Sequence, residues 1–290
     1  ILQALSTIRE ASGVATAALR RATDADASAR QRALAACETV SEAAGELLSV
    51  DDTRVMWRRR DRLVVLPLDV SDVVREGIIG ERAAVFTSAT LQIGGTFSTV
   101  AESLGLRAGE WIGEDVGSPF DYQTQGILFV PDRLAPPGPD WPTPQALGIA
   151  TDLVQAAGGR ALVLMASWNG VAAMAQALEL TAPGRLLVQK RGEPTAPLIR
   201  QFAEEPDSVL VGTLGLWQGV DVPGDACTLV IIDKLPFPPP TDPVVSARQA
   251  AIDARGGSGW MQVSLPQAAV TLAQGAGRLI RSGEDRGVVA

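Results

Sequence analysis

The segment Ala161-Leu-Val-Leu-Met165 is a short apolar run of the length and composition expected for a buried β-strand. Working outward from it, residues 145–156 and 171–180 carry helical patterns. The alternation continues with strands at 185–188, 208–211 and 228–232, a helix at 197–204, and a helical region from about 266 to 281. Strands that alternate with helices predict an α/β fold, in which a parallel sheet is covered on both faces. In such sheets the functional residues lie in loops after the strand C-termini.

The part of the chain before this alternation has a different organisation. Apolar residues at loosely helical spacing in residues 1–50, with a turn pattern at 23–28, predict an antiparallel helical pair. After Asp52 we expect short strands at 54–57, 62–66 and 83–87, and a short helix at 73–79. The proline-rich stretch 131–144 predicts a loop or linker, because proline removes a backbone donor and fixes φ.

Composition excludes several classes of function. The chain contains no histidine, and Cys37 and Cys227 are isolated, so histidine catalysis, a disulfide framework and a cysteine or histidine metal site are not expected. Apolar residues make up 46% of the chain, which is typical of a soluble globular protein, and no apolar run approaches the length of a membrane span. The net charge of −8 argues against binding nucleic acid through bulk charge, so any grip on DNA must be local. The chain starts at Ile1 and ends on an apolar run, and we expect it to be part of a longer protein.

The strongest local signal is Gln274-Gly-Ala-Gly-Arg278-Leu-Ile-Arg281. A helix through this segment would place Gln274, Arg278 and Arg281 on one face, at positions i, i+4 and i+7. An amide and two guanidinium groups suit a polyphosphate, because the guanidinium fork matches phosphate oxygens. The alternative is a solvated basic face near a helix C-terminus, where arginine is favourable in any case.

Two further features of this segment concern its backbone. Ser264 and Gln267 have the spacing of a capping box that could start the helix. Gly275 and Gly277 would each cost about 1 kcal/mol relative to alanine inside a helix. A helix that accepts this cost is expected to need close backbone approach to another group.

Three weaker signals accompany it. The glycine-rich segment 209–224 follows a strand and contains the polar residues Thr213, Gln218 and Asp221; its glycines would let backbone amides approach phosphate or sugar. Residues 87–91 place hydroxyl groups after a strand. Ser167 and Trp168 end another strand, where such a pair can hold a backbone phosphate and stack a base. The first could equally be a surface turn, and the other two are more often ordinary strand ends.

The order of these segments resembles the C-terminal motor motifs of superfamily 2 DNA helicases, with the closest match in the DinG/XPD-like branch. Residues 87–91 resemble motif III, 162–168 motif IV, 212–224 motif V and 274–281 motif VI. The runs 67–70, 118–122 and 233–243 are similar to segments of DinG-type proteins. The resemblance covers residues 55–290, and residues 1–50 match by position alone, as the end of the helical insertion called the Arch.

The resemblance implies a fold and a division into domains. It implies a RecA-like parallel sheet flanked by helices at 119–290, which would be the second helicase lobe with motifs IV to VI. Residues 53–118 would be the end of the first lobe with motif III, and residues 1–52 the end of an Arch-like helical insertion.

The resemblance also implies roles for the nucleotide-binding residues. Arg281 would be the arginine finger on the ATP γ-phosphate, and Arg278 and Gln274 would contact the phosphates. Asp221, with Gly219 and Gly277, would help to hold the nucleotide. The family usually has glutamate before the Gly-Val-Asp of motif V, and this chain has Gln218, which puts the coupling of motif V to hydrolysis in question.

For DNA, the resemblance implies backbone contacts from Ser167 and Thr213, with Trp168 beside them. The hydroxyl residues of motif III would couple nucleotide state to DNA grip; they are Thr87, Ser88 and Thr90. The implied partners are single-stranded and forked or branched DNA and the protein's own N-terminal lobe, with no membrane. The implied polarity is 5′ to 3′, and the implied location is the cytoplasm, at the nucleoid.

Some parts of such a motor are missing from the sequence. No glycine is followed by lysine, so there is no P-loop, and no Asp-Glu-x-x box or group of four cysteines occurs. ATP and Mg²⁺ would therefore be bound mainly by an upstream N-terminal lobe, as would an iron–sulfur cluster if one is present. We expect the chain alone to be inactive. The alternatives are a non-catalytic DNA- or partner-binding module and, less well supported, a Rossmann-type enzyme, whose G-x-G-x-x-G run is absent.

Overall fold

The computed structural model describes residues 2–22, 26–219 and 226–290, without the side chains of 217–219. The chain forms two compact units, and each is described by itself. Unit 1 comprises Ile1–Val85, Ser98–Trp111 and Pro239–Val263. Unit 2 comprises Phe86–Phe97, Ile112–Pro238 and Ser264–Ala290.

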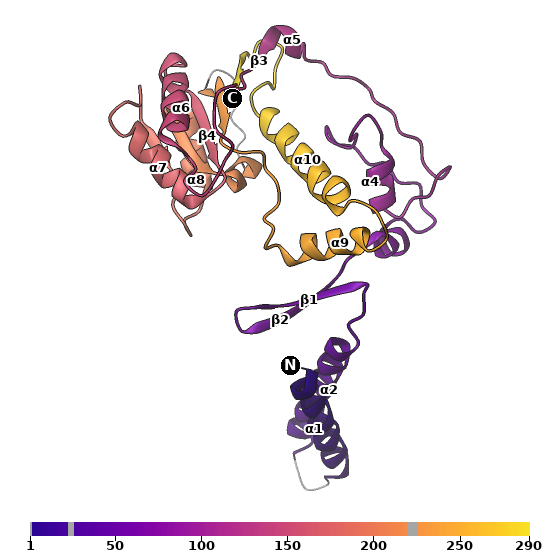
Figure 1. Cartoon of the computed structure of the whole chain (residues 1–290). Helices are drawn as coiled ribbons and strands as arrows, with labels where there is room; N and C mark the ends of the chain where they lie inside the picture. Colours follow the sequence, from indigo (N-terminus) through magenta and orange to yellow (C-terminus); the bar gives the residue numbers. More distant parts are fainter. Residues whose placement is uncertain (1, 23–25, 220–225) are drawn as a thin grey trace. The chain divides into compact units, whose positions relative to one another are not determined.

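Unit 1 begins with the predicted helical pair, α1 (Leu2–Arg21) and α2 (Ala27–Leu48), which lie side by side (Figure 1). Arg20 forms a 2.8 Å ion pair with Glu38, and Arg30 donates a 2.5 Å hydrogen bond to the carbonyl of Ala22. Asp26 caps α2 by accepting from the N–H of Ser28. The pair is confirmed, and residues 23–25 of the predicted turn lie outside the described residues.

A β-hairpin and several short helices complete unit 1. Strands β1 (Arg54–Arg59) and β2 (Arg62–Pro67) pair antiparallel, as predicted, and α3 (Ser71–Val74) continues into the π-helical turn η1 (Arg75–Ile79). The remaining helices are α4 (Ser98–Ser103) and α9 (Pro243–Asp253). Arg75 holds the loop after α4 through two hydrogen bonds to Glu110, at 2.5 and 2.8 Å, and one to the carbonyl of Gly105.

The predicted strand at 83–87 is wrong. Residues 83–88 carry no strand in the structure, and Val85 is 89% exposed. A strand requires a neighbouring strand to accept and donate its ladder hydrogen bonds, and no strand among the described residues pairs with this segment. Its apolar composition favours a strand, but composition alone does not provide a partner.

Unit 2 is built around a six-stranded, wholly parallel sheet in the order β3-β8-β7-β4-β6-β5. The strands, in chain order, are β3 (Gly126–Leu128), β4 (Ala161–Met165), β5 (Leu186–Val188), β6 (Val209–Thr213), β7 (Leu229–Ile232) and β8 (Gly287–Val289). The predicted parallel α/β sheet is confirmed. The central strand β4 is fully apolar, and its side chains are at most 2% exposed.

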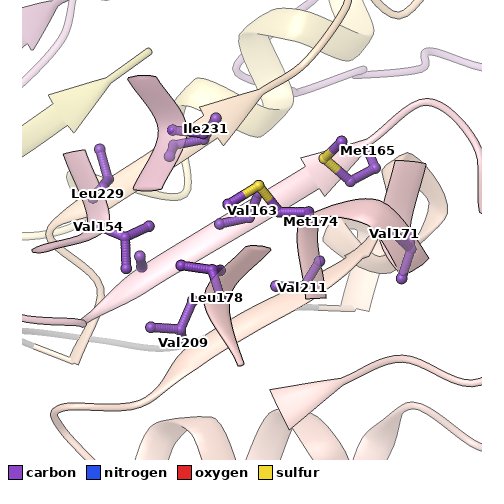
Figure 2. Packing of buried hydrophobic residues seen from close by; sticks show 12 residues of the cluster. Val154, Val163, Met165, Val171, Met174, Leu178, Val209, Val211, Leu229 and Ile231 are labelled. Carbon is purple, nitrogen blue, oxygen red and sulfur yellow. The ribbon is translucent and has the colours of Figure 1, made fainter. Parts of the chain in front are cut away.

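Alternate residues of the central strands enter two separate apolar cores, one on each face of the sheet. On one face Val163, Val211 and Ile231 pack with Met174 and other side chains from helices α6 (Pro144–Ala156) and α7 (Trp168–Leu178) (Figure 2). On the other face Leu162, Leu164, Leu210 and Val230 pack with Phe202 of α8 (Ala196–Glu204). The strand period of two therefore explains why both faces need covering helices.

The final helix, α10 (Leu265–Ala276), is shorter than predicted. Gly277 caps its C-terminus, and the N–H groups of Arg278 and Leu279 donate to carbonyls three residues back, which tightens the chain into a turn. Glycine is a poor helix former, and here the helix stops between its two glycines. The predicted common helical face is therefore wrong: Gln274 lies on the helix, Arg278 in the turn and Arg281 beyond it.

The predicted capping box at the start of α10 is also wrong. Ser264 has helical dihedral angles and makes no side-chain cap hydrogen bond, because the chain enters α10 from the π-helical turn η4 (Trp260–Ser264). An N-cap residue needs a non-helical backbone to direct its oxygen at the first free N–H groups.

Candidate functional site

The carboxyl ends of the parallel strands meet at one edge of the sheet, which we call the carboxyl edge. Ser167 and Trp168 follow β4 at this edge and begin α7. The Ser167 hydroxyl caps α7 by accepting from the N–H of Gly170 at 3.0 Å. The Arg191 guanidinium, which follows β5, lies 5.4 Å from the centre of the half-buried Trp168 ring. Stacking of this kind gives the edge an aromatic surface with a fixed positive charge.

Thr213 ends β6 at the same edge and is held by Gln189, which follows β5. The Gln189 Oε1 accepts from the backbone N–H of Thr213 at 2.7 Å and is 3.1 Å from its hydroxyl. Gly212 has no room for a side chain, since a Cβ there would lie 2.5 Å from Leu216 Cδ2 and 2.8 Å from Gln189 Oε1. The glycine thus lets the Gln189 amide approach β6 closely and fix Thr213.

Asp233, directly after β7, ties two strand ends together. Its carboxylate accepts from the N–H of Ala166 at 2.7 Å. Burial raises the pKa of Asp233, although the hydrogen bond from Ala166 opposes the shift. Lys234 follows it, with Nζ 5.9 Å from the Trp141 ring centre.

The predicted phosphate-binding arginines lie at the opposite, amino edge of the sheet. The segment 277–286 leads into the first residue of β8, Gly287, which is paired with Gly126, the first residue of β3. The Nε of Arg278 is buried and has no hydrogen-bond partner among the described residues. Arg281 is half-buried, and its Nε donates to the carbonyl of Arg278 at 3.4 Å. Burial lowers the pKa of Arg281, and the charge of Asp285 opposes this shift.

The other predicted residues occupy separate places. Ser88 accepts from the N–H of Thr90 at 3.2 Å, and with Thr87 they form a largely exposed loop. Gln274 is exposed on the last turn of α10, and Gly277 is the C-cap of this helix. Gly219 ends the 3₁₀ turn η2 (Leu214–Gly219), and Asp221 lies outside the described residues.

Sequence reasoning missed five residues that shape these edges: Gln125, Gln189, Arg191, Asp233 and Asp285. Gln189, Arg191 and Asp233 had a usable signal, since each follows a predicted strand. Gln125 had none, because its loop partners are carbonyl groups distant in sequence, and Asp285 had none, because two of its three hydrogen bonds come from backbone N–H groups. Across residues 2–22, 26–219 and 226–290 no group of three or more Cys, Asp or Glu side chains could hold a metal ion, and no helix is long and apolar enough to cross a membrane.

Known helicases are similar to this chain in sequence. Residues 150–290 match the family described as the helicase C-terminal domain. The chain is 45% identical over 230 residues to the ATP-dependent helicase DinG of Mycobacterium tuberculosis, and 40% identical over 234 residues to the ATP-dependent DNA helicase YoaA of Haemophilus influenzae. These alignments cover 79 and 80% of this chain but only 34 and 36% of the relatives.

Solved structures agree on the fold. An XPD helicase superposes with a TM-score of 0.56 at 14% identity, covering 93% of this chain and 52% of that one. This match supports the α/β fold with a six-stranded parallel sheet flanked by helices. Residues 150–290 therefore match a helicase C-terminal domain, and the chain is similar to DinG-type helicases over 34 to 36% of their length.

Proposed function

We propose that this chain is the C-terminal part of an ATP-dependent DNA helicase, which couples ATP hydrolysis to movement along single-stranded DNA and to unwinding in DNA repair. This proposal is based on two surfaces of different chemistry at opposite edges of one sheet. Aromatic, hydroxyl and basic groups gather at the carboxyl edge, and a loop with two arginines lies at the amino edge. A single rigid sheet therefore joins a surface suited to a nucleic-acid strand with a surface suited to phosphate.

The nucleotide proposal rests on the loop with the two arginines. Arg281 would act as the arginine finger on the γ-phosphate, and Arg278 and Gln274 would contact the phosphates. The buried, unpaired Nε of Arg278 supports this, because a buried guanidinium donor needs an acceptor and phosphate oxygens match its geometry. Asp221, Gly219 and Gly277 would complete the contact. ATP and Mg²⁺ would be held mainly by an upstream lobe, which supplies the P-loop lysine and the metal-binding carboxylate.

The DNA proposal rests on the carboxyl edge. Trp168 would stack a base, with Arg191 adding charge next to the ring. Ser167 and Thr213 would contact the strand's phosphates, through groups that α7 and Gln189 already hold in place. Such a local set of contacts fits a chain whose net charge is −8. Forked or branched DNA, 5′ to 3′ movement and a place at the nucleoid in the cytoplasm belong to the same proposal.

The remaining parts of the proposal concern organisation. Thr87, Ser88 and Thr90 would couple nucleotide state to DNA grip. The proposed domains are an Arch-like end at 1–52, the end of the first lobe at 53–118 and the second lobe at 119–290. The upstream part of the first lobe is the proposed protein partner of the second lobe.

The test is Arg281→Ala in the longer protein that contains this chain. An arginine finger contributes about 10³-fold or more to kcat, so we expect a loss of that order with ATP affinity changed by less than about threefold. Arg286→Ala is the matched control, since Arg286 is an exposed arginine five positions further on in the same segment. An unchanged kcat in Arg281→Ala would refute the finger role.

A second candidate is a non-catalytic DNA- or partner-binding module. It is favoured by Gln218, which stands where the family usually has a glutamate in motif V. The same protein preparation distinguishes the two candidates. A module would bind single-stranded DNA through the carboxyl edge, and neither the wild type nor Arg281→Ala would show DNA-stimulated ATP turnover.

A further inference from the structure

The loop that carries Arg281 is folded around one buried carboxylate. Asp285 is 8% exposed, and its Oδ2 accepts from the backbone N–H groups of Arg281, at 2.8 Å, and Ser282, at 2.9 Å. Its Oδ1 accepts from the Ser282 hydroxyl at 2.8 Å. Burial favours the neutral acid, but the hydrogen bonds from Arg281 and Ser282 outweigh it and lower the pKa of Asp285. The carboxylate is therefore ionised at neutral pH, and its hydrogen bonds from the backbone N–H groups of Arg281 and Ser282 are charge-assisted.

A second residue holds the same loop from outside. Gln125, at the end of α5 (Tyr122–Gln125), is 6% exposed. Its Nε2 lies within hydrogen-bond distance of three loop carbonyls, those of Ser282 at 3.0 Å, Gly283 at 3.1 Å and Asp285 at 2.9 Å. Its Oε1 accepts from the N–H of Asp121 at 2.9 Å, which fixes the orientation of the amide. Only a donor suits this position, because all three loop groups facing it are acceptors.

The two residues connect the loop to the sheet. Gln125 directly precedes β3, and Asp285 stands two residues before β8, which pairs with β3 in parallel through Gly126 and Gly287. The loop backbone is thus tied at both sides to paired strands. Its anchor comes from a segment that lies 157 to 160 residues away in sequence.

We infer that Gln125 and Asp285 are positioning residues for Arg281, which hold its backbone so that the guanidinium reaches the nucleotide. This inference rests on the proposed function, because holding the Arg281 backbone matters only if Arg281 contacts the phosphate. In this inference both residues act through the backbone of the loop and not through contact with the nucleotide. Since a misplacement of about 1 Å costs about 100-fold in rate, a loosened loop lowers turnover even when every catalytic side chain is present.

The first experiment measures hydrogen exchange in this chain. Gln125→Leu keeps the bulk and removes the donors, and Asp285→Asn keeps the shape and removes the charge. In both variants the amides of Arg281 and Ser282 should exchange at least about tenfold faster, while those of β4 and β6 keep their protection. Gln123→Leu, an exposed position on the same helix, should change neither. Should either variant fail to retain protection in β4 and β6, Ser282→Ala replaces it, because Ser282 is exposed and its hydroxyl donates to Asp285 and accepts from the N–H of Glu284.

The second experiment measures turnover in the longer protein. Gln125→Leu should lower kcat by about 10- to 100-fold, with KM for ATP and the Kd for single-stranded DNA within about threefold of wild type. In an Arg281→Ala background the same change should cause little further loss, because it acts through Arg281. A merely structural role would lower kcat equally in both backgrounds.

The outcomes separate the inference from the function on which it rests. Unchanged exchange at Arg281 and Ser282, or faster exchange with normal kcat, would overturn the positioning role. Normal kcat in Arg281→Ala alone would overturn the finger role, and the exchange data would still decide whether Gln125 and Asp285 hold the loop.

Discussion

Cys227 shows at the scale of one residue how fully the sheet of unit 2 excludes solvent. It is 3% exposed, and its Sγ lies 3.7 Å from the carbonyl of Leu229. Burial raises the pKa of the thiol to about 12. Because of this raised pKa, almost no Cys227 thiolate is present near neutral pH. The thiolate is the reactive form of cysteine.

Alkylation with iodoacetamide at pH 8 should therefore distinguish the two cysteines. We expect Cys37, half-buried on α2, to be modified in the folded chain and Cys227 to react only after denaturation. Peptide mass spectrometry of the two samples gives the labelled fraction at each site. Equal labelling of both cysteines under native conditions would show that the core of unit 2 opens readily.

At the same scale, the sequence predicted the place of some candidate residues in the sheet better than their surroundings. Ser167 and Thr213 could be proposed because strong strand patterns precede them, and both lie at the carboxyl edge, while their roles stay predictions. Gln125 could not be identified, since its three partners are carbonyl groups 157 to 160 residues away. Long-range pairing of a side chain with a backbone group leaves no pattern in a single sequence.

At the scale of elements, the end of β6 depends on the absence of one side chain. A Cβ at Gly212 would lie 2.5 Å from Leu216 Cδ2, and Leu216 is only 2% exposed and has little room to move. It would also displace the Gln189 amide that holds Thr213. Gly212→Ala should therefore lower the free energy of unfolding by about 1 to 3 kcal/mol, as measured by urea denaturation.

Gly215→Ala is the matched control, three residues further on in η2. A Cβ there meets only the Thr213 hydroxyl, at 3.8 Å, and the site is exposed. Its free energy of unfolding should stay within about 0.5 kcal/mol of wild type. Equal destabilisation by the two substitutions would mean that steric contact at Gly212 is not the cause.

Element boundaries show where sequence patterns are insufficient. Strands β4 to β7 and helices α6 to α8 were predictable because each carries its own apolar pattern, as in Ala161–Met165, whereas the three-residue strands β3 and β8 were not predicted. The segment 83–87 carries a similar pattern, but a strand also depends on a pairing partner. The end of α10 depends on Gly275 and Gly277, whose helix-breaking tendency competes with the regular spacing of Gln274, Arg278 and Arg281.

At the scale of the whole molecule, the sheet of unit 2 connects the two proposed binding surfaces. Strand β6 ends in Thr213 at the carboxyl edge, and the connection from β6 to the parallel strand β7 returns the chain to the amino edge. Motif V lies in this connection. The two proposed surfaces therefore lie on one sheet, and any coupling between them within unit 2 would pass through its paired strands.

The isolated chain should hydrolyse no ATP. Phosphoryl transfer needs a P-loop lysine and a carboxylate-held Mg²⁺ as well as an arginine finger, and no glycine in these 290 residues is followed by lysine. Phosphate release from the chain with ATP, Mg²⁺ and single-stranded DNA should stay at the level of a protein-free blank. The longer protein should show DNA-stimulated release, which Arg281→Ala removes and Arg286→Ala retains. Adding the upstream lobe to the isolated chain should restore part of this activity if the two parts associate. DNA-stimulated turnover by the chain alone would require a phosphate-binding lysine site of its own, in place of the shared site proposed for the two lobes.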